Sequence, residues 1–201
     1  MSLAPLLHAS GCLFAPGSLV ETVYRWDQRL PDPANARAAH TAAAAALTRP
    51  LDGAVVWLPA EAGRSVATLA AAVRPLLVGM AVAESGRDER WVRARIPRSS
   101  WRLRIAGQVV YPLAFGPCYG PDSSRYTFGL DASFVLLQPA AAFTRRHDPA
   151  TGRISGRARE LIRAEHRRAG RGYDLALTLS PFECHRVVKP ARRGAHPVVW
   201  W

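Results

Sequence analysis

Short apolar runs alternate with longer alanine- and leucine-rich stretches along the first half of the chain. The alanine-rich stretch 34–47 lies between two prolines, which predicts a helix. The run 53–58 is β-branched and bounded by turn residues, which predicts a buried strand. The stretch 63–83 has helical composition but contains Pro75, so it predicts either two helices or one kinked helix.

The pattern of the second half opens with a β-hairpin. Apolar and basic residues alternate over 101–105, Ala106-Gly107 makes a turn, and 108–115 reads as the returning strand. Pro112 within that strand predicts an edge position or a bulge. A further apolar run, 132–138, predicts another buried strand.

Two more segments complete the expected domain. An amphipathic helix is predicted at 156–169, and 181–190 is expected to form a final ordered strand or loop. Strands and helices mix without a regular β-α-β rhythm, which predicts a single α+β domain over 1–193. We expect its sheet to be mixed or mostly antiparallel, with flanking helices. Residues 194–201 form a tail that is either disordered or held by its two terminal tryptophans, and its apolar end could cover a pocket or a second subunit of a homodimer.

Charge divides the chain into two unequal parts. The 201 residues carry a net charge of +12, and their 49% hydrophobic content is enough for a substantial core. Residues 1–86 hold six arginines and six carboxylates, so all of the excess comes from 87–201. Of the 27 basic residues, Lys189 alone is a lysine. We therefore expect the second half to meet anions, whether phosphate, nucleic acid or the carboxylates of a small ligand.

Several broad classes are excluded or disfavoured by composition and motif. No uninterrupted apolar run reaches the roughly 18 residues of a membrane span, and no basic segment precedes the first apolar run as in a secretory signal. Three cysteines at wide spacing are typical of cytoplasmic thiols, not of a disulfide framework or a zinc site. Phosphate-binding glycine loops and serine-hydrolase elbows are absent. We expect a cytoplasmic protein with no membrane partner.

The loop 117–126 gathers the most chemistry in the chain, since it places Cys118, Tyr119, Arg125 and Tyr126 between two predicted strands. Arg125 could hold a carboxylate through two parallel hydrogen bonds, or it could be one surface arginine among many. Cys118 could be a soft metal ligand or a small buried apolar residue.

Two further sequence features allow a functional and a structural interpretation. His185 adjoins an apolar segment, as a metal or haem ligand would, but such a histidine is more often satisfied by a backbone carbonyl. The arginine-rich helix within 157–171 could follow a nucleic acid backbone. Because Glu160 and Glu165 interrupt its charge and no aromatic residue is interleaved, a solvated helix face fits it better.

The block 101–146 resembles the bacterial YqcI/YcgG family. In that family a hydrophobic hairpin leads into a Pro-Cys/Leu-Tyr-Pro turn, an Arg-Tyr pair, and an apolar strand that ends in Gln-Pro before a phenylalanine. The matching residues here are Pro117-Cys118-Tyr119, Arg125-Tyr126, 134–139 and Phe143; the opening 12–15 and the late segments 162–173 and 185–190 are similar to the same family.

The resemblance implies a haem b protein that hydroxylates nitrogen on a guanidino or amino group of a small, amino-acid-like substrate. The histidine that the family usually has in the turn is replaced here by 122–124, which leaves two alternatives: loss of haem, or a change of the iron ligand to His185 or Cys118. Arg125 would then bind a propionate or the substrate carboxylate, with Tyr119 and Tyr126 beside the substrate. Two alternatives stay open: a basic, non-enzymatic nucleic-acid-binding protein, and a catalytically inactive family member.

Overall fold

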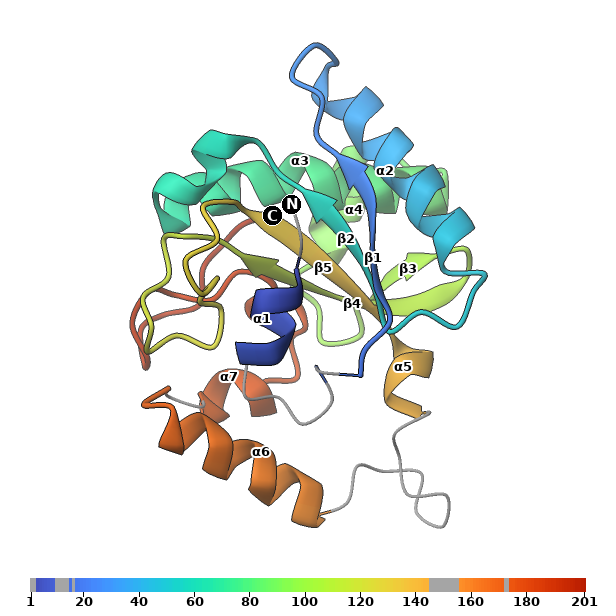
Figure 1. Ribbon diagram of the computed structural model, residues 1–201. Helices are drawn as coiled ribbons and strands as arrows, with labels where there is room; N and C mark the ends of the chain where they lie inside the picture. The colour runs from blue at the N-terminus through green and yellow to red at the C-terminus, as the bar shows by residue number, and fades with distance from the viewer. Residues whose placement is uncertain (1–2, 10–14, 16, 145–155, 172–173) are drawn as a thin grey trace.

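One mixed sheet forms the centre of the molecule (Figure 1). The computed structural model describes residues 3–9, 15, 17–144, 156–171 and 174–201. The strands are β1 (Val20–Arg25), β2 (Gly53–Trp57), β3 (Leu103–Ile105), β4 (Gln108–Phe115) and β5 (Phe134–Pro139), in the order β1-β2-β5-β4-β3. The β1–β2 pair is parallel and the other pairs are antiparallel. The predicted single α+β domain with a mixed sheet and flanking helices is confirmed.

Helices lie on both sides of this sheet. Figure 1 shows α2 (Asp32–Ala46), α3 (Val66–Ser85) and α4 (Glu89–Arg95) on one side, with the short 3-10 helix η1 (Ala60–Arg64) leading into α3. The other side carries α1 (Ala4–Ala9), α5 (Ala140–Thr144), α6 (Gly156–Arg168) and α7 (Leu175–Leu179). The final helical turn, α8 (Cys184–Val187), packs beside β4.

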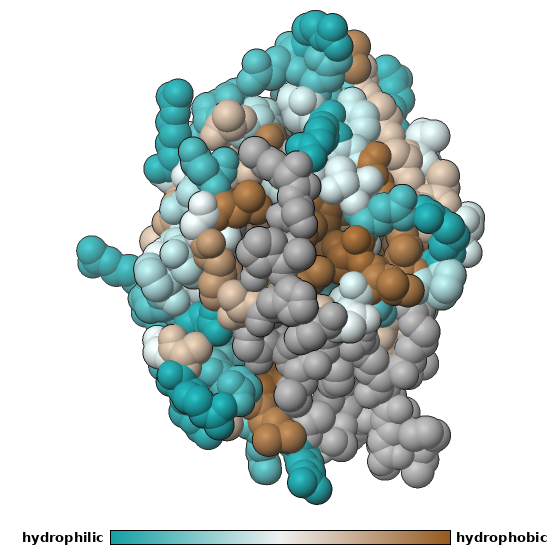
Figure 2. Space-filling model, viewed as in Figure 1, coloured by the Kyte–Doolittle hydropathy of each residue, from teal (hydrophilic) through white to brown (hydrophobic). Residues whose placement is uncertain are grey.

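The sheet separates two apolar clusters because successive side chains of a strand point to opposite faces. In β2, Ala54 and Val56 join the large core under α2 and α3. Val55 and Trp57 join a smaller cluster on the other face, which Leu6 of α1 completes. Every residue of β2 is buried, as its unbroken apolar sequence predicts. Figure 2 shows apolar side chains gathered near the middle of one face of the molecule and polar side chains over the helices above.

The stretch around Pro75 forms one continuous helix, α3. Its first turn is closed by Ser65, whose hydroxyl accepts a hydrogen bond from the Thr68 amide at 3.0 Å, and it ends at Gly86 in the left-handed conformation. With 20 residues and a high mean hydropathy, α3 is long and apolar enough to span a membrane by length and composition. Its Leu69, Val73, Leu76, Leu77 and Met80 are fully buried in the large core.

The predicted hairpin is present as β3 and β4, but β3 pairs with only the first three residues of β4. Pro112 therefore lies past the end of β3, where β4 is an edge strand as predicted. The predicted strand or loop at 181–190 instead contains α8. Cys184, Val187 and Val188 are all buried, and their spacing suits one face of a helical turn, whereas the alternation of a strand would turn some of them outward.

The C-terminal tail is held against the domain. Trp200 is fully buried within the large core, and its indole Nε1 donates a hydrogen bond to the Cys184 carbonyl at 2.7 Å. Arg74 of α3 donates to the Trp200 carbonyl at 2.9 Å. The sequence left two alternatives for 194–201, a disordered tail or one held by its terminal tryptophans, and the structure has the second.

Candidate functional site

A cavity of about 650 Å³ opens on the α5–α7 side of the sheet, and we call it the Arg125 cavity. Its floor is formed by Tyr111 and Leu113 of β4, which point to the same face of the strand. Phe143 of α5 and Leu177 of α7 add apolar walls. Four charged residues also line the cavity: Arg125, Glu183, Arg186 and Lys189.

Arg125 is the most deeply buried of the three cations, with 5% of its surface exposed. Its Nη2 donates to the Arg186 carbonyl at 2.8 Å, and its guanidinium lies 5.0 Å from the centroid of the Phe115 ring. Burial lowers its pKa to about 10, so it keeps its charge at neutral pH. Its Nε is buried and makes no hydrogen bond. The buried Arg125 guanidinium thus keeps a donor that the described residues leave without a hydrogen bond.

Lys189 places an amine at the same cavity. Its Nζ donates to the Ser124 hydroxyl at 3.0 Å. Burial, together with the positive charge of Arg125, lowers the pKa of Lys189 to about 8, although Asp174 acts in the opposite direction. The two cations therefore repel one another across a partly dry space, and an anion between them would relieve that repulsion.

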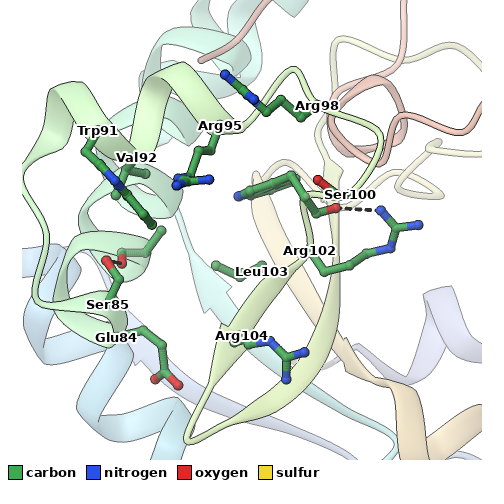
Figure 3. A pocket seen from close by; sticks show the side chains of 12 residues that line it. Glu84, Ser85, Trp91, Val92, Arg95, Arg98, Ser100, Arg102, Leu103 and Arg104 are labelled. Atoms are coloured by element: carbon green, nitrogen blue, oxygen red, sulfur yellow. Dashed lines mark hydrogen bonds between the residues drawn. The ribbon is translucent and has the colours of Figure 1, made fainter.

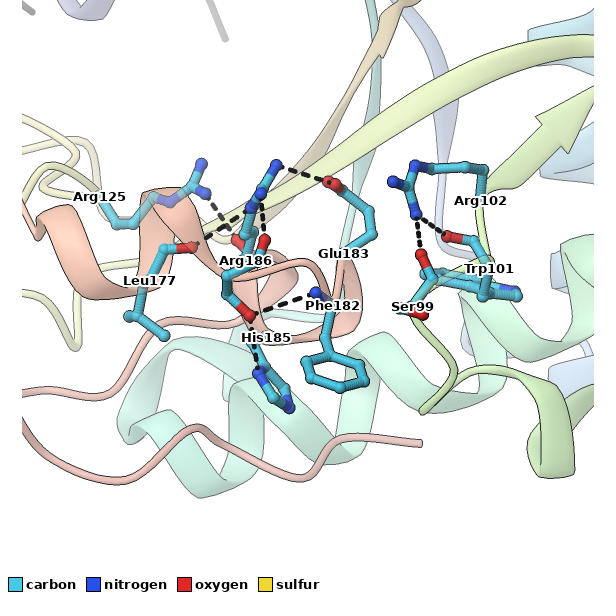
Figure 4. Close-up of polar contacts among 10 residues, drawn as sticks. Ser99, Trp101, Arg102, Arg125, Leu177, Phe182, Glu183, His185 and Arg186 are labelled. Carbon is cyan, nitrogen blue, oxygen red and sulfur yellow. Dashed lines mark hydrogen bonds and ion pairs between the residues drawn. The ribbon is translucent and has the colours of Figure 1, made fainter.

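Arg186 and Glu183 form an ion pair at the α8 side of the cavity (Figure 4). Arg186 Nη1 lies 3.2 Å from Glu183 Oε2, and the same guanidinium donates to the carbonyls of Leu177 and Ser180. Burial raises the pKa of Glu183, while the charges of Arg186, Arg102 and Arg125 act to lower it. Since Arg186 has partners for its guanidinium, Arg125 and Lys189 are left as the groups that can bind an incoming anion.

The structure brings only one residue of the predicted substrate site to this cavity. Arg125 lines it. Tyr119 is buried in the core instead, and its hydroxyl donates to the Lys189 carbonyl at 2.8 Å, which holds the Lys189 backbone in place. Burial raises the pKa of Tyr119. The Tyr126 ring lies 5.0 Å from the Phe128 ring and does not line the cavity.

The two predicted iron ligands also lie outside the cavity lining. His185 lies on α8 with its ring 5.1 Å from that of Phe182, and its Nδ1 is 3.3 Å from the Ser180 hydroxyl, as Figure 4 shows. Burial lowers its pKa. Cys118 is half-buried against the large core, and burial raises the pKa of its thiol. Within the described part of the chain no group of three or more His, Cys, Asp or Glu side chains could hold a metal ion.

These placements test how well the cavity suits haem. Apolar walls and cationic groups for two propionates are present. An axial histidine, cysteine or methionine is absent from the lining among the described residues, and Tyr111 is the one lining side chain of an iron-ligating kind. His185 and Cys118 therefore do not fit a haem in this cavity, and we derive no step through haem.

Three of the four charged residues of the cavity were missed by the sequence analysis: Glu183, Arg186 and Lys189. The arginine-rich composition hides Arg186, and Glu183 is one of 15 acids with no distinguishing spacing. Lys189 did carry a signal, because it is the one lysine among 27 bases.

A scan against protein-family models and searches of curated proteins and solved structures found no match to this chain. The resemblance to the YqcI/YcgG family stays a prediction.

Proposed function

We propose that this protein binds a small organic anion in the Arg125 cavity, with the carboxylate or phosphate of the ligand held by Arg125 and Lys189. The observation that carries the proposal is the buried, unpartnered Nε of Arg125 at a cavity lined by three cations and one carboxylate. A charged hydrogen bond in such a dry site is stronger than in water, and leaving its donor unused is costly.

The remaining walls restrict the body of the ligand. Tyr111, Leu113, Phe143 and Leu177 suit a short apolar or mixed chain. A cationic end of the ligand would be placed best near Glu183. An amino-acid-like molecule combines these features, and it is the substrate class that the family resemblance implies for nitrogen hydroxylation. We place the protein in the cytoplasm, with the free thiols Cys118 and Cys184 in support.

Calorimetry with matched small molecules tests this proposal. Amino acids, short carboxylic acids and inorganic phosphate are titrated into the purified protein, and each acid is compared with its neutral amide. We expect the acids to bind and to raise the melting temperature, because the acids, unlike the amides, supply a negative charge to pair with the Arg125 guanidinium. Equal affinity for acid and amide, or no binding by any compound, would contradict it. Haem is tested on the same protein, expressed with haem supplied, by its Soret absorption.

A second candidate function, single-stranded nucleic acid binding, is favoured by a different surface. A groove of about 390 Å³ beside α4 and β3 combines Trp91 and Trp101 with four arginines (Figure 3): Arg95, Arg98, Arg102 and Arg104. Trp91 is 39% exposed, and the Arg95 guanidinium lies 4.0 Å from its ring centroid. Trp101 is partly buried against the large core, so Trp91 is the ring available for stacking. An exposed aromatic ring among arginines is typical of surfaces that stack bases and neutralise phosphates.

Fluorescence anisotropy with a labelled 12-nucleotide RNA tests this second function. We expect W91A combined with R98Q to weaken binding at least tenfold, because stacking and a phosphate contact are lost together. R29Q/R49Q is the matched control, since it removes two exposed arginines that do not line the groove. An equal loss in the control variant, or no fall in affinity with added salt, would rule out a specific site in this groove.

A further inference from the structure

The single lysine of the chain lies in the Arg125 cavity. Arginine occupies 26 of the 27 basic positions, and Lys189 is the exception. An arginine at this position could supply the positive charge and could donate to Ser124 as Lys189 does. What arginine cannot supply is a neutral amine, because a guanidinium does not lose its proton in proteins. The position therefore points to chemistry that needs a primary amine.

Lys189 lines two neighbouring cavities. It lines the Arg125 cavity and also a second, smaller cavity of about 170 Å³, which Ser124 and Asp174 line on the other side. Its backbone carbonyl is fixed by the hydroxyl of Tyr119, and its Nζ is oriented by the hydroxyl of Ser124. The amine thus lies beside the proposed anion site, and among the described residues it forms no close ion pair.

Burial is the main factor that favours the neutral form of Lys189; of the charges near it, Arg125 acts in the same direction and Asp174 in the opposite one. Arg125 approaches from the loop before β5, and Arg186 and Glu183 approach from α8. Asp174, which caps α7, and His166 of α6 also interact with it electrostatically. With a pKa of about 8, roughly a tenth of Lys189 is neutral at pH 7, compared with fewer than about one in a thousand for an ordinary lysine. Desolvation and a neighbouring cation are the two factors that activate lysine nucleophiles.

We propose that Lys189 forms an imine with the carbonyl carbon of a small oxo acid whose carboxylate is bound by Arg125. The neutral amine attacks the carbonyl carbon, a C–N bond forms, and the carbonyl oxygen leaves as water with the two amine hydrogens. No oxidant or reductant is consumed in this step. The inference rests on the proposed anion site, since Arg125 must hold the acid so that its carbonyl faces Lys189.

Reductive trapping tests the imine. The protein is incubated at pH 7.5 with pyruvate, glyoxylate or 2-oxoglutarate and sodium cyanoborohydride, and the modified residue is identified by peptide mass mapping. The reagent converts an imine into a stable secondary amine on the same nitrogen. The assignment is unambiguous because Lys189 and the α-amino group of the expressed chain are the only amines. That α-amino group serves as the internal control for unselective labelling.

We expect saturable labelling of Lys189, at least tenfold faster than labelling of the α-amino group, and suppressed by inorganic phosphate. K189R, checked for an unchanged melting temperature, should lose the label and keep measurable acid binding. Labelling confined to the α-amino group would overturn the imine, and the proposed function would still stand if calorimetry shows that the oxo acids bind. If the oxo acids neither bind nor label, the imine proposal fails, and the proposed function fails with it only if none of the other anions binds in the calorimetry.

Discussion

Replacing Trp200 by alanine should destabilise the domain by about 3–5 kcal/mol, which is the usual cost of emptying a large aromatic site in a core. Trp200 is fully buried, its ring lies 6.1 Å from that of Trp101, and its Nε1–H satisfies the Cys184 carbonyl. The substitution therefore leaves a cavity and an unpaired carbonyl together. Because the tail holds α8 through this contact, the α8 side of the Arg125 cavity should loosen as well.

Urea unfolding followed by circular dichroism measures this change. The matched control is V199A in the same tail, since Val199 is 63% exposed and its loss should cost less than about 0.5 kcal/mol. A W200A variant within 1 kcal/mol of the native protein would mean that the tail does not belong to the folded core. Residues 194–201 would then be a tail outside the domain, as the predicted domain boundary at 193/194 has it.

Residues with a strong local pattern were predictable from the sequence. The all-apolar run of β2 and the hairpin turn at Ala106-Gly107 placed three strands, and alanine content placed α2 within two residues. The short elements α1, α4, α5, α7 and β1 were not predicted, because five to seven residues give too few positions for a clear apolar period. In β1, for example, no residue is fully buried, so its apolar and polar positions give little contrast.

The candidate site was harder to predict because its residues come together only in the folded chain. Arg125 lies more than 50 positions before the other three charged residues of the cavity, and the packing of α8 beside β4 is what joins them. A helical turn at α8 was not expected, so the sequence offered no reason to place Glu183 and Arg186 at the cavity. The same limit explains why Tyr119 and Tyr126 do not line the cavity together with Arg125: loop residues that are close in sequence need not share a cavity.

The largest functional change is expected from Arg125→Met. This substitution removes the guanidinium that carries the unused Nε and keeps an apolar side chain of similar length over the Phe115 ring. We expect the affinity for small acids to fall about 100-fold, equivalent to about 3 kcal/mol and consistent with the loss of charged hydrogen bonds in a dry site. Stability should change by less than about 1 kcal/mol, because the lost hydrogen bond to the Arg186 carbonyl is offset by removal of a buried charge with an unsatisfied donor.

A closely matched control is available in Arg171→Met. Arg171 is also buried, lies over a phenylalanine ring at 4.9 Å, donates to a backbone carbonyl and has an unpartnered Nε, but it does not line the Arg125 cavity. If both variants lose acid binding equally, the loss reflects general damage and not a lost contact with the ligand. Arg125→Lys should recover part of the affinity, since it restores the charge without the paired donors.

Arg125→Met should also change the pKa of Lys189, an effect that a purely structural role of Arg125 would not produce. The charge of Arg125 is one cause of the lowered pKa of Lys189, so its removal should raise that pKa from about 8 toward the value of an ordinary lysine. Acylation of Lys189, followed by peptide mapping across pH, reports this as a midpoint displaced to higher pH in R125M and unchanged in R171M. Since only the neutral amine reacts, labelling of Lys189 at pH 7 should fall in R125M. An unmoved midpoint would mean that burial alone activates the amine and that Arg125 acts on the ligand only.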